Sequence, residues 1–367
     1  MKKIFIFIFL SLFFLPLATL AQDLHQEENF KAKVIEVLEE KEVVDESGLV
    51  IVQQNLKLVA TSGSLEDQEI VFNGVDNFQF LSSRAYEVGD KLIMSHSLNE
   101  DSVDNFFILD YDRTPSILWL GFIFVLSVLV VGRWKGLRSL LALIISFLVI
   151  IKFIIPQILA GQNPVLISVI GGVVILFFSI YLTQGFNKKA HLANLALIIS
   201  LLFVAGLSLL FTEIAQLSGY AGEETIFLLE MTQGSLNLRG LLLAGIMIGT
   251  LGVLDDVIIS QVSAVEQIKQ ANSSLSKKQV YKMSSKIGID HITSMINTLF
   301  FAYAGVALPL LILFSQSDIV GLNLGQIINN EVVSTEIIRT LLGSIGIILA
   351  VPIANWLASY FLPSSQK

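Results

Sequence analysis

The sequence predicts an α-helical polytopic membrane protein of about seven spans, preceded by a small N-terminal all-β domain. Hydrophobic residues make up 54% of its 367 residues, and charged residues make up only 15%. A soluble domain averages roughly 25% charged residues. The mean hydropathy is +0.74, and several apolar stretches reach the roughly 20 residues that cross a hydrocarbon core of about 30 Å. These values exclude a soluble globular protein.

Residues 1–21 have the pattern of a secretory signal peptide. Lys2 and Lys3 form a short positive region, an apolar run follows, and Ala18 to Ala21 offer a small-residue cleavage site before polar residues. An uncleaved anchor helix is the alternative. Whether residues 1–21 are a cleaved signal peptide or an uncleaved anchor helix, residues 22–113 are expected on the extracytoplasmic side of the membrane.

Residues 22–113 predict the all-β domain, as an OB-like barrel or a sandwich. Runs rich in β-branched and aromatic residues are separated by turn signals such as Asn73-Gly74. The runs predict strands at Phe30–Leu38, Leu49–Leu58, Glu69–Phe72, Phe78–Leu81, Lys91–Ser95 and Phe106–Leu109. The domain holds 20 acidic and 7 basic residues, a net charge of −13. No basic patch is present, so nucleic acid is not an expected partner.

Residues 114–367 predict a seven-span transmembrane domain. The spans are expected near Ser116–Val131, Leu137–Ile155, Val165–Thr183, His191–Phe211, Arg239–Val265, His291–Ser315 and Glu336–Phe361. Alternate loops are rich in lysine and arginine, and the others are neutral or acidic, which is the positive-inside pattern. The C-terminus is therefore expected in the cytoplasm. The inner segment Glu266–Gly288 has the pattern of an amphipathic helix at the membrane surface.

Two adjacent aspartates, Asp255 and Asp256, lie inside the fifth predicted span. Asp255 is 16 residues after Arg239, which is about 24 Å along a helix and places the pair in the inner half of the membrane. A carboxylate at that depth costs several kcal/mol unless it is protonated, paired or hydrated. The default interpretation is functional, with structural helix–helix contact as the alternative.

Helical spacing places Gly245, Gly249, Gly252 and Asp256 on one stripe of this span. Small residues at such spacing let another helix approach closely, so the glycines predict a helix-packing face with Asp256 in a packed interior. The sixth span offers partners for the aspartates at His291, Thr293 and Asn297. Such a cluster can hold a proton or bind a cation through oxygen ligands.

Other kinds of site find little support in the sequence. The chain has no cysteine and only four scattered histidines, so no metal site can be assigned. No phosphate-binding loop is present, and no cofactor is predicted. An intramembrane aspartyl protease is disfavoured, because adjacent acids on one helix do not face each other as a catalytic dyad requires. An enzyme is therefore not the expected class.

The signal sequence, exported β domain, seven spans and the segment GTLGVLDDVIISQVSAVEQI together resemble the YibE/F-like membrane protein family. The resemblance implies a multi-pass protein of the bacterial cell membrane. The stretch from Gly245 to Leu313 is also similar, more weakly, to resistance–nodulation–division transporters, which use intramembrane acids to couple proton movement. That similarity implies that Asp255 and Asp256 are proton acceptors.

Two functions are therefore expected. The first is proton- or cation-coupled transport, or assistance to export, with the aspartate pair as the coupling site. The second is a non-enzymatic scaffold or assembly factor in the lipid bilayer, whose β domain binds an exported protein partner. Neutralising the aspartates should abolish the first function and leave the second intact.

Overall fold

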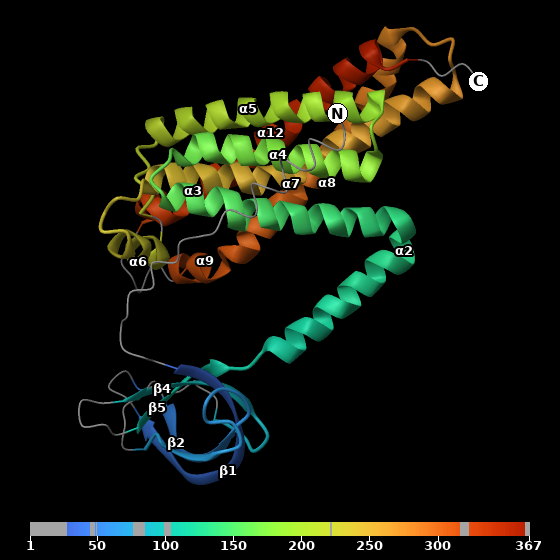
Figure 1. Cartoon of the computed structure of the whole chain (residues 1–367). Helices are drawn as coiled ribbons and strands as arrows, with labels where there is room; N and C mark the ends of the chain where they lie inside the picture. Colours follow the sequence, from blue (N-terminus) through green and yellow to red (C-terminus); the bar gives the residue numbers. More distant parts are fainter. Residues whose placement is uncertain are drawn as a thin grey trace. The chain divides into compact units, whose positions relative to one another are not determined.

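The structure is a computed structural model that describes residues 28–44, 48, 50–75, 85–98, 104–220, 222–315 and 323–363. The predicted signal peptide and the predicted strand at Phe78–Leu81 lie outside these residues. The chain forms two compact units, Met1–Ser127 and Val128–Lys367 (Figure 1). Each unit is described by itself below.

The first unit contains a five-stranded antiparallel sheet with the strand order β3-β2-β1-β4-β5. The strands are β1 (Glu28–Val44), β2 (Val50–Ala60), β3 (Glu69–Asn73), β4 (Lys91–Leu98) and β5 (Asp104–Tyr111). Each of the five predicted strands within the described residues overlaps one of them. The all-β character of the domain is therefore confirmed.

The core of this unit lies on one face of the sheet. Alternate side chains of β1 are buried, namely Phe30, Ala32 and Val34, because successive residues of a strand point to opposite faces. Ala32 lies opposite Ala60 of β2 and opposite Leu92 of β4, and both are fully buried. The registry thus gathers the apolar residues of the central strands into one cluster.

A buried glutamine fixes the loop that precedes β4. The Gln54 side chain accepts a hydrogen bond from the Tyr86 backbone N–H at 2.7 Å and donates to the Tyr86 carbonyl at 3.1 Å. The Tyr86 ring is thereby held in the core, 5.0 Å from the ring of Tyr111. Burial raises the pKa of Tyr86 to about 12, with a smaller contribution from Tyr111.

This raised pKa predicts a loss of stability in alkali. Folding favours neutral Tyr86, so its contribution is complete below the ordinary tyrosine pKa of about 10 and is lost as the pH rises from there through about 12. Tyr86→Phe should flatten the stability profile in this window. Tyrosinate absorbance should show one late-titrating group in the wild type that is missing from the variant. An unchanged titration curve would contradict the assignment.

The helical elements follow the sheet along the chain. They are α2 (Thr114–Val149), η1 (Ile150–Ile154), α3 (Ile155–Leu159), α4 (Pro164–Gln184), α5 (Lys188–Ile214), α6 (Glu223–Met231), α7 (Leu238–Ala271), α8 (Lys277–Val306), α9 (Leu308–Ser315), α11 (Leu324–Asn329) and α12 (Glu331–Phe361). Within the described residues, five helical segments are long and apolar enough to cross a membrane: Thr114–Leu159, α4, α5, α7 and α12. A polytopic membrane protein is thus confirmed.

The first two predicted spans lie in one helical run, Thr114–Leu159. Arg133 interrupts this run with φ 48° and ψ −130°, a backbone conformation that a helix does not contain. The predicted spans Ser116–Val131 and Leu137–Ile155 lie on either side of this break. A five-residue π-helix, η1, then precedes Pro156, whose missing N–H perturbs the helical hydrogen bonds.

The predicted surface helix at Glu266–Gly288 is wrong as a separate element. Its first residues end α7, and α8 begins at Lys277 and runs without a break through His291 to Val306. Ser276 and Gln279 form a capping box that starts α8. Pro309 follows closely, so α9 carries the remainder of the sixth predicted span. This division explains why α8 is not one of the five segments.

In the second unit, α12 packs against α5, α7 and α8, and α4 packs against α5 and α7 (Figure 1). Glycines permit two of these close approaches. A Cβ at Gly346 of α12 would lie 2.7 Å from Val204 Cγ2 of α5. A Cβ at Gly288 of α8 would lie 2.4 Å from Val351 Cγ1 of α12. Helix α12 therefore contacts α5, α7 and α8, whereas α7 contacts α4, α5, α8 and α12.

A buried lysine joins the ends of α7 and α12. Lys269 is only 5% exposed, and its ammonium group donates to the carbonyls of Ala358, Ser359 and Leu362 at 3.3, 2.8 and 2.5 Å. The last carbonyls of a helix have no partner within the helix and carry partial negative charge. Lys269 thus caps α12 from a neighbouring helix.

Candidate functional site

The two aspartates of α7 face different neighbours. They lie midway along a helix that runs without interruption from Leu238 to Ala271. Asp255 is half-buried, whereas Asp256 is exposed. Adjacent residues diverge by about 100° around a helix, so only one of the two can face the interior. The prediction placed Asp256 there, and the structure shows that it is Asp255.

Ser179 of α4 holds the Asp255 carboxylate. The Ser179 hydroxyl donates to Asp255 Oδ2 at 2.8 Å. The other oxygen, Oδ1, is buried and has no hydrogen-bond partner within the described part of the chain. A buried polar atom without a partner is costly. The site therefore has one carboxylate oxygen with a hydrogen-bond partner and one buried oxygen without a partner among the described residues.

Helices α4 and α7 run parallel, which explains why these two residues meet. At one end of the pair, Pro164 of α4 lies beside Gly240 of α7, where a Cβ would come within 2.9 Å of the proline ring. Ser179 and Asp255 are each 15 residues further along their helices, or about 22 Å at 1.5 Å per residue. The contact at Gly240 therefore sets the register of the hydrogen bond.

Asp255 lies at the wall of a pocket of about 300 Å³ between α2, η1, α4 and α7. The other residues that line it are Ser139, Ala142, Leu143, Ser146 and Phe147 of α2, Ile150 of η1, Ile175, Leu176 and Ser179 of α4, and Ile248, Leu251 and Gly252 of α7. The lining is largely aliphatic. Its polar groups are Asp255 and three serine hydroxyls.

The sequence prediction missed the three serines. Ser139, Ala142, Leu143, Ser146 and Phe147 recur at three- and four-residue spacing, so they form one face of α2. That spacing of small and polar residues in an apolar segment was the available signal. Ser179 carried no comparable signal, because nothing in the sequence indicates that α4 lies against α7.

The predicted partners on α8 do not gather around the pocket. The His291 side chain lies close enough to Asp256 for electrostatic interaction. The Thr293 hydroxyl donates to the Ile289 carbonyl of its own helix at 2.9 Å, and Asn297 is exposed. Asp256 therefore faces α8, and the predicted cluster of both aspartates with these three residues does not form. Among the described residues, no group of three or more His, Cys, Asp or Glu side chains could hold a metal ion.

The glycine stripe also differs from its predicted role. A Cβ at Gly245 or Gly252 would meet no atom within 4 Å in the described structure, so neither is a packing position within this chain. Gly252 instead lines the pocket beside Asp255. At Gly249, a Cβ would lie 3.2 Å from the Tyr303 hydroxyl of α8. Only this third glycine lies close to another helix.

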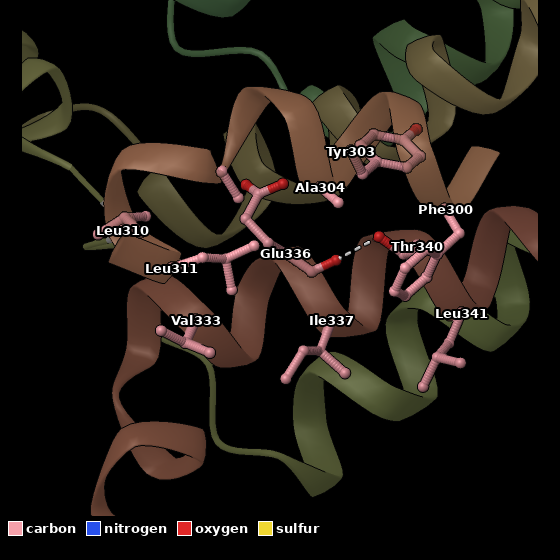
Figure 2. Close-up of a pocket in the computed structure, with 11 residues that line it drawn as sticks. Phe300, Tyr303, Ala304, Leu310, Leu311, Val333, Glu336, Ile337, Thr340 and Leu341 are labelled. Atoms are coloured by element: carbon pink, nitrogen blue, oxygen red, sulfur yellow. Dashed lines mark hydrogen bonds between the residues drawn. The ribbon is translucent and has the colours of Figure 1, made fainter. Parts of the chain in front are cut away.

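A second cavity, of about 180 Å³, lies between α8, α9 and α12. Figure 2 shows its side chains, which are mostly apolar, around Glu336 and Thr340 of α12. The Glu336 carboxylate pairs with Arg339 at 2.8 Å. The charge of this acid is therefore compensated within its own helix, unlike that of Asp255.

Comparison with known proteins identifies one family. The family model described as YibE/F-like protein matches residues 120–364, well over half of the chain. The matched residues include both aspartates and every described residue that lines the pocket. No curated protein matches the chain, and no solved structure matches it.

Proposed function

The chain belongs to the YibE/F-like family, and we propose that it is a multi-pass protein of the bacterial cell membrane in which Asp255 binds a proton or a cation during coupled transport or assistance to export. One observation carries the proposal. The buried Oδ1 of Asp255 has no partner, although the carboxylate stands at the wall of a pocket that also holds serine hydroxyls.

The chemistry of this carboxylate supports the proposal. An ionised acid inside an apolar bundle is strongly unfavourable unless its charge is compensated. Ser179 satisfies Oδ2 alone, and no lysine, arginine or histidine belongs to the described lining of the pocket. A proton on Oδ1 removes the charge, and a cation bound to Oδ1 and serine oxygens balances it. Protonation and cation binding each change the net charge of the site. Coupled transport requires such a change when the proton or cation binds and leaves.

The proposal includes an orientation in the membrane. The positive-inside pattern places the OB-like β domain, residues 22–113, outside the cytoplasm after a cleaved signal peptide. Seven spans then bring the C-terminus into the cytoplasm. In this orientation Asp255 stands about 25 Å from Leu238, the outer end of α7. The site is then closer to the cytoplasmic side, and a ligand from outside must cross most of the bilayer to reach it.

Asp255→Asn is the direct test. In the wild type, a bound ligand adds about 2.7 kcal/mol of stability at a concentration one hundred times its Kd. We expect the Tm of the full-length protein to depend on pH or on Na⁺, K⁺, Mg²⁺ or Ca²⁺ at matched ionic strength. The asparagine variant should lose this dependence, because an amide neither takes up the proton nor balances a cation.

Asp256→Asn is the matched control, because it removes an adjacent carboxylate that does not line the pocket. It should keep the wild-type dependence. Dicyclohexylcarbodiimide, which modifies protonated carboxyl groups in apolar surroundings, should label Asp255, and a bound cation should protect it. Identical profiles for the wild type and Asp255→Asn, with no labelling, would sink the proposal and favour the scaffold alternative.

A further inference from the structure

The pocket beside Asp255 is far larger than a proton or a bare metal ion requires. Its volume is about 300 Å³, whereas one water occupies roughly 30 Å³ in the liquid. Pockets for small organic molecules begin at about 300 Å³. The space therefore suits a small organic ligand.

The lining indicates that most of this ligand is apolar. Leu143, Phe147 and Ile150 form much of one wall, and Leu251 and Ile248 contribute from α7. The Ser146 hydroxyl donates to the Ala142 carbonyl at 2.9 Å, so it is engaged within its own helix. An aliphatic cavity is a poor host for water, and it gains free energy when apolar groups fill it.

The charge indicates that one end of the ligand is cationic. Asp255 is the one ionisable residue in the described lining, and its Oδ1 is unpartnered. Phe147 supplies an aromatic ring in the same lining, and aromatic faces attract cations. The cavity beside Glu336 differs from this pocket, because the Glu336 carboxylate already pairs with Arg339.

We infer that the pocket binds a small organic ammonium ion, with its charged group at Asp255 and its alkyl groups against α2 and α7. The inference rests on the proposed function and specifies the class of substrate for the same site. A protonated amine or a quaternary ammonium ion meets both requirements. An inorganic cation fulfils only the charge requirement, and a lipid chain only the apolar one.

The test compares choline with 3,3-dimethylbutan-1-ol, which has the same shape and no charge. Calorimetric titration and Tm are measured on the full-length protein in an uncharged detergent. Choline should bind at least about tenfold more tightly than the neutral alcohol, a difference of roughly 1.4 kcal/mol, because only choline carries a positive charge that the Asp255 carboxylate attracts in apolar surroundings. Tetramethylammonium, tetraethylammonium and benzyltrimethylammonium extend the series.

Variants locate the binding. Asp255→Asn should abolish the preference for the charged probes, and Asp256→Asn should retain it. Ser179→Ala and Phe147→Ala keep the carboxylate and should weaken choline binding several-fold, so they serve if Asp255→Asn does not fold. Choline should also protect Asp255 from carbodiimide labelling.

Several outcomes overturn the inference. Equal binding of choline and the neutral alcohol would make the pocket a site for lipid or detergent chains. Binding that persists in Asp255→Asn would place the ammonium ion elsewhere. A Tm that responds to Na⁺ or pH through Asp255, but to none of the ammonium ions, would refute the organic ligand and leave the proposed function standing.

Discussion

Lys269→Met should lower the free energy of unfolding by about 3 kcal/mol, as buried acceptors that lose a charged donor typically do. The methionine fills a similar volume, so the change removes the ammonium group and leaves the packing nearly intact. The carbonyls of Ser359 and Leu362 then lose the ammonium donor, and the Ala358 carbonyl keeps only the Leu362 backbone N–H. Helix α12 also loses the positive charge that opposes the negative end of its dipole.

Thermal unfolding of the full-length protein measures this loss, and hydrogen exchange locates it at the end of α12. Lys278→Met is the control, because Lys278 is an exposed lysine at the start of α8, and its replacement should change stability by less than about 0.5 kcal/mol. If the two variants had equal Tm values, the three hydrogen bonds of Lys269 would contribute nothing measurable.

Gly288→Ala should destabilise the protein by about 2 kcal/mol, although alanine is the better helix former by about 1 kcal/mol. The new Cβ would lie 2.4 Å from Val351 Cγ1 and 3.0 Å from Gln261 Oε1. Val351 is buried and β-branched, so it cannot rotate away freely. Helices α8 and α12 must therefore separate.

A second glycine of the same helix provides the control. A Cβ at Gly305 would meet nothing within 4 Å in the described structure, so Gly305→Ala should stabilise α8 by up to about 1 kcal/mol. Opposite signs in the two Tm shifts are the expected result. Adding Val351→Ala to Gly288→Ala should recover part of the loss, since it removes the clashing methyl group. Stabilisation by both glycine replacements would show that α8 and α12 are not in close contact.

The sequence was sufficient for most of the local elements. Strands could be predicted because alternation in segments such as β1 reflects one buried face. The helices could be predicted from long apolar runs, and Asp255 and Asp256 stood out because acids are rare in such runs. The continuity of α8 was missed because its lysines and apolar residues indicated a separate amphipathic surface helix, although Ser276 and Gln279 already had the spacing of a capping box that starts a helix there.

The partners of the aspartates could not be predicted, because they depend on which helices are neighbours. Ser179 is 76 residues from Asp255, and no local pattern links them. Chain order favours α8 because it follows α7, whereas the half-buried Asp255 lines a pocket with residues of α2 and α4. The glycines were misassigned for a related reason. A small residue such as Gly252 produces the same pattern whether it faces a helix or a cavity.

The position of α12 against three earlier helices has a consequence for how the protein is made. Helices α5, α7 and α8, which pack against α12, precede it in the chain, so they are made while this neighbour is still being synthesised. Until it arrives, the Gln261 side chain, which is 1% exposed in the finished bundle, has lipid or the insertion machinery beside it, and an amide in lipid is unfavourable. Completion of the bundle is thus one late step. A nascent chain that stops before α12 therefore leaves the Gln261 amide without this covering, at a cost in free energy.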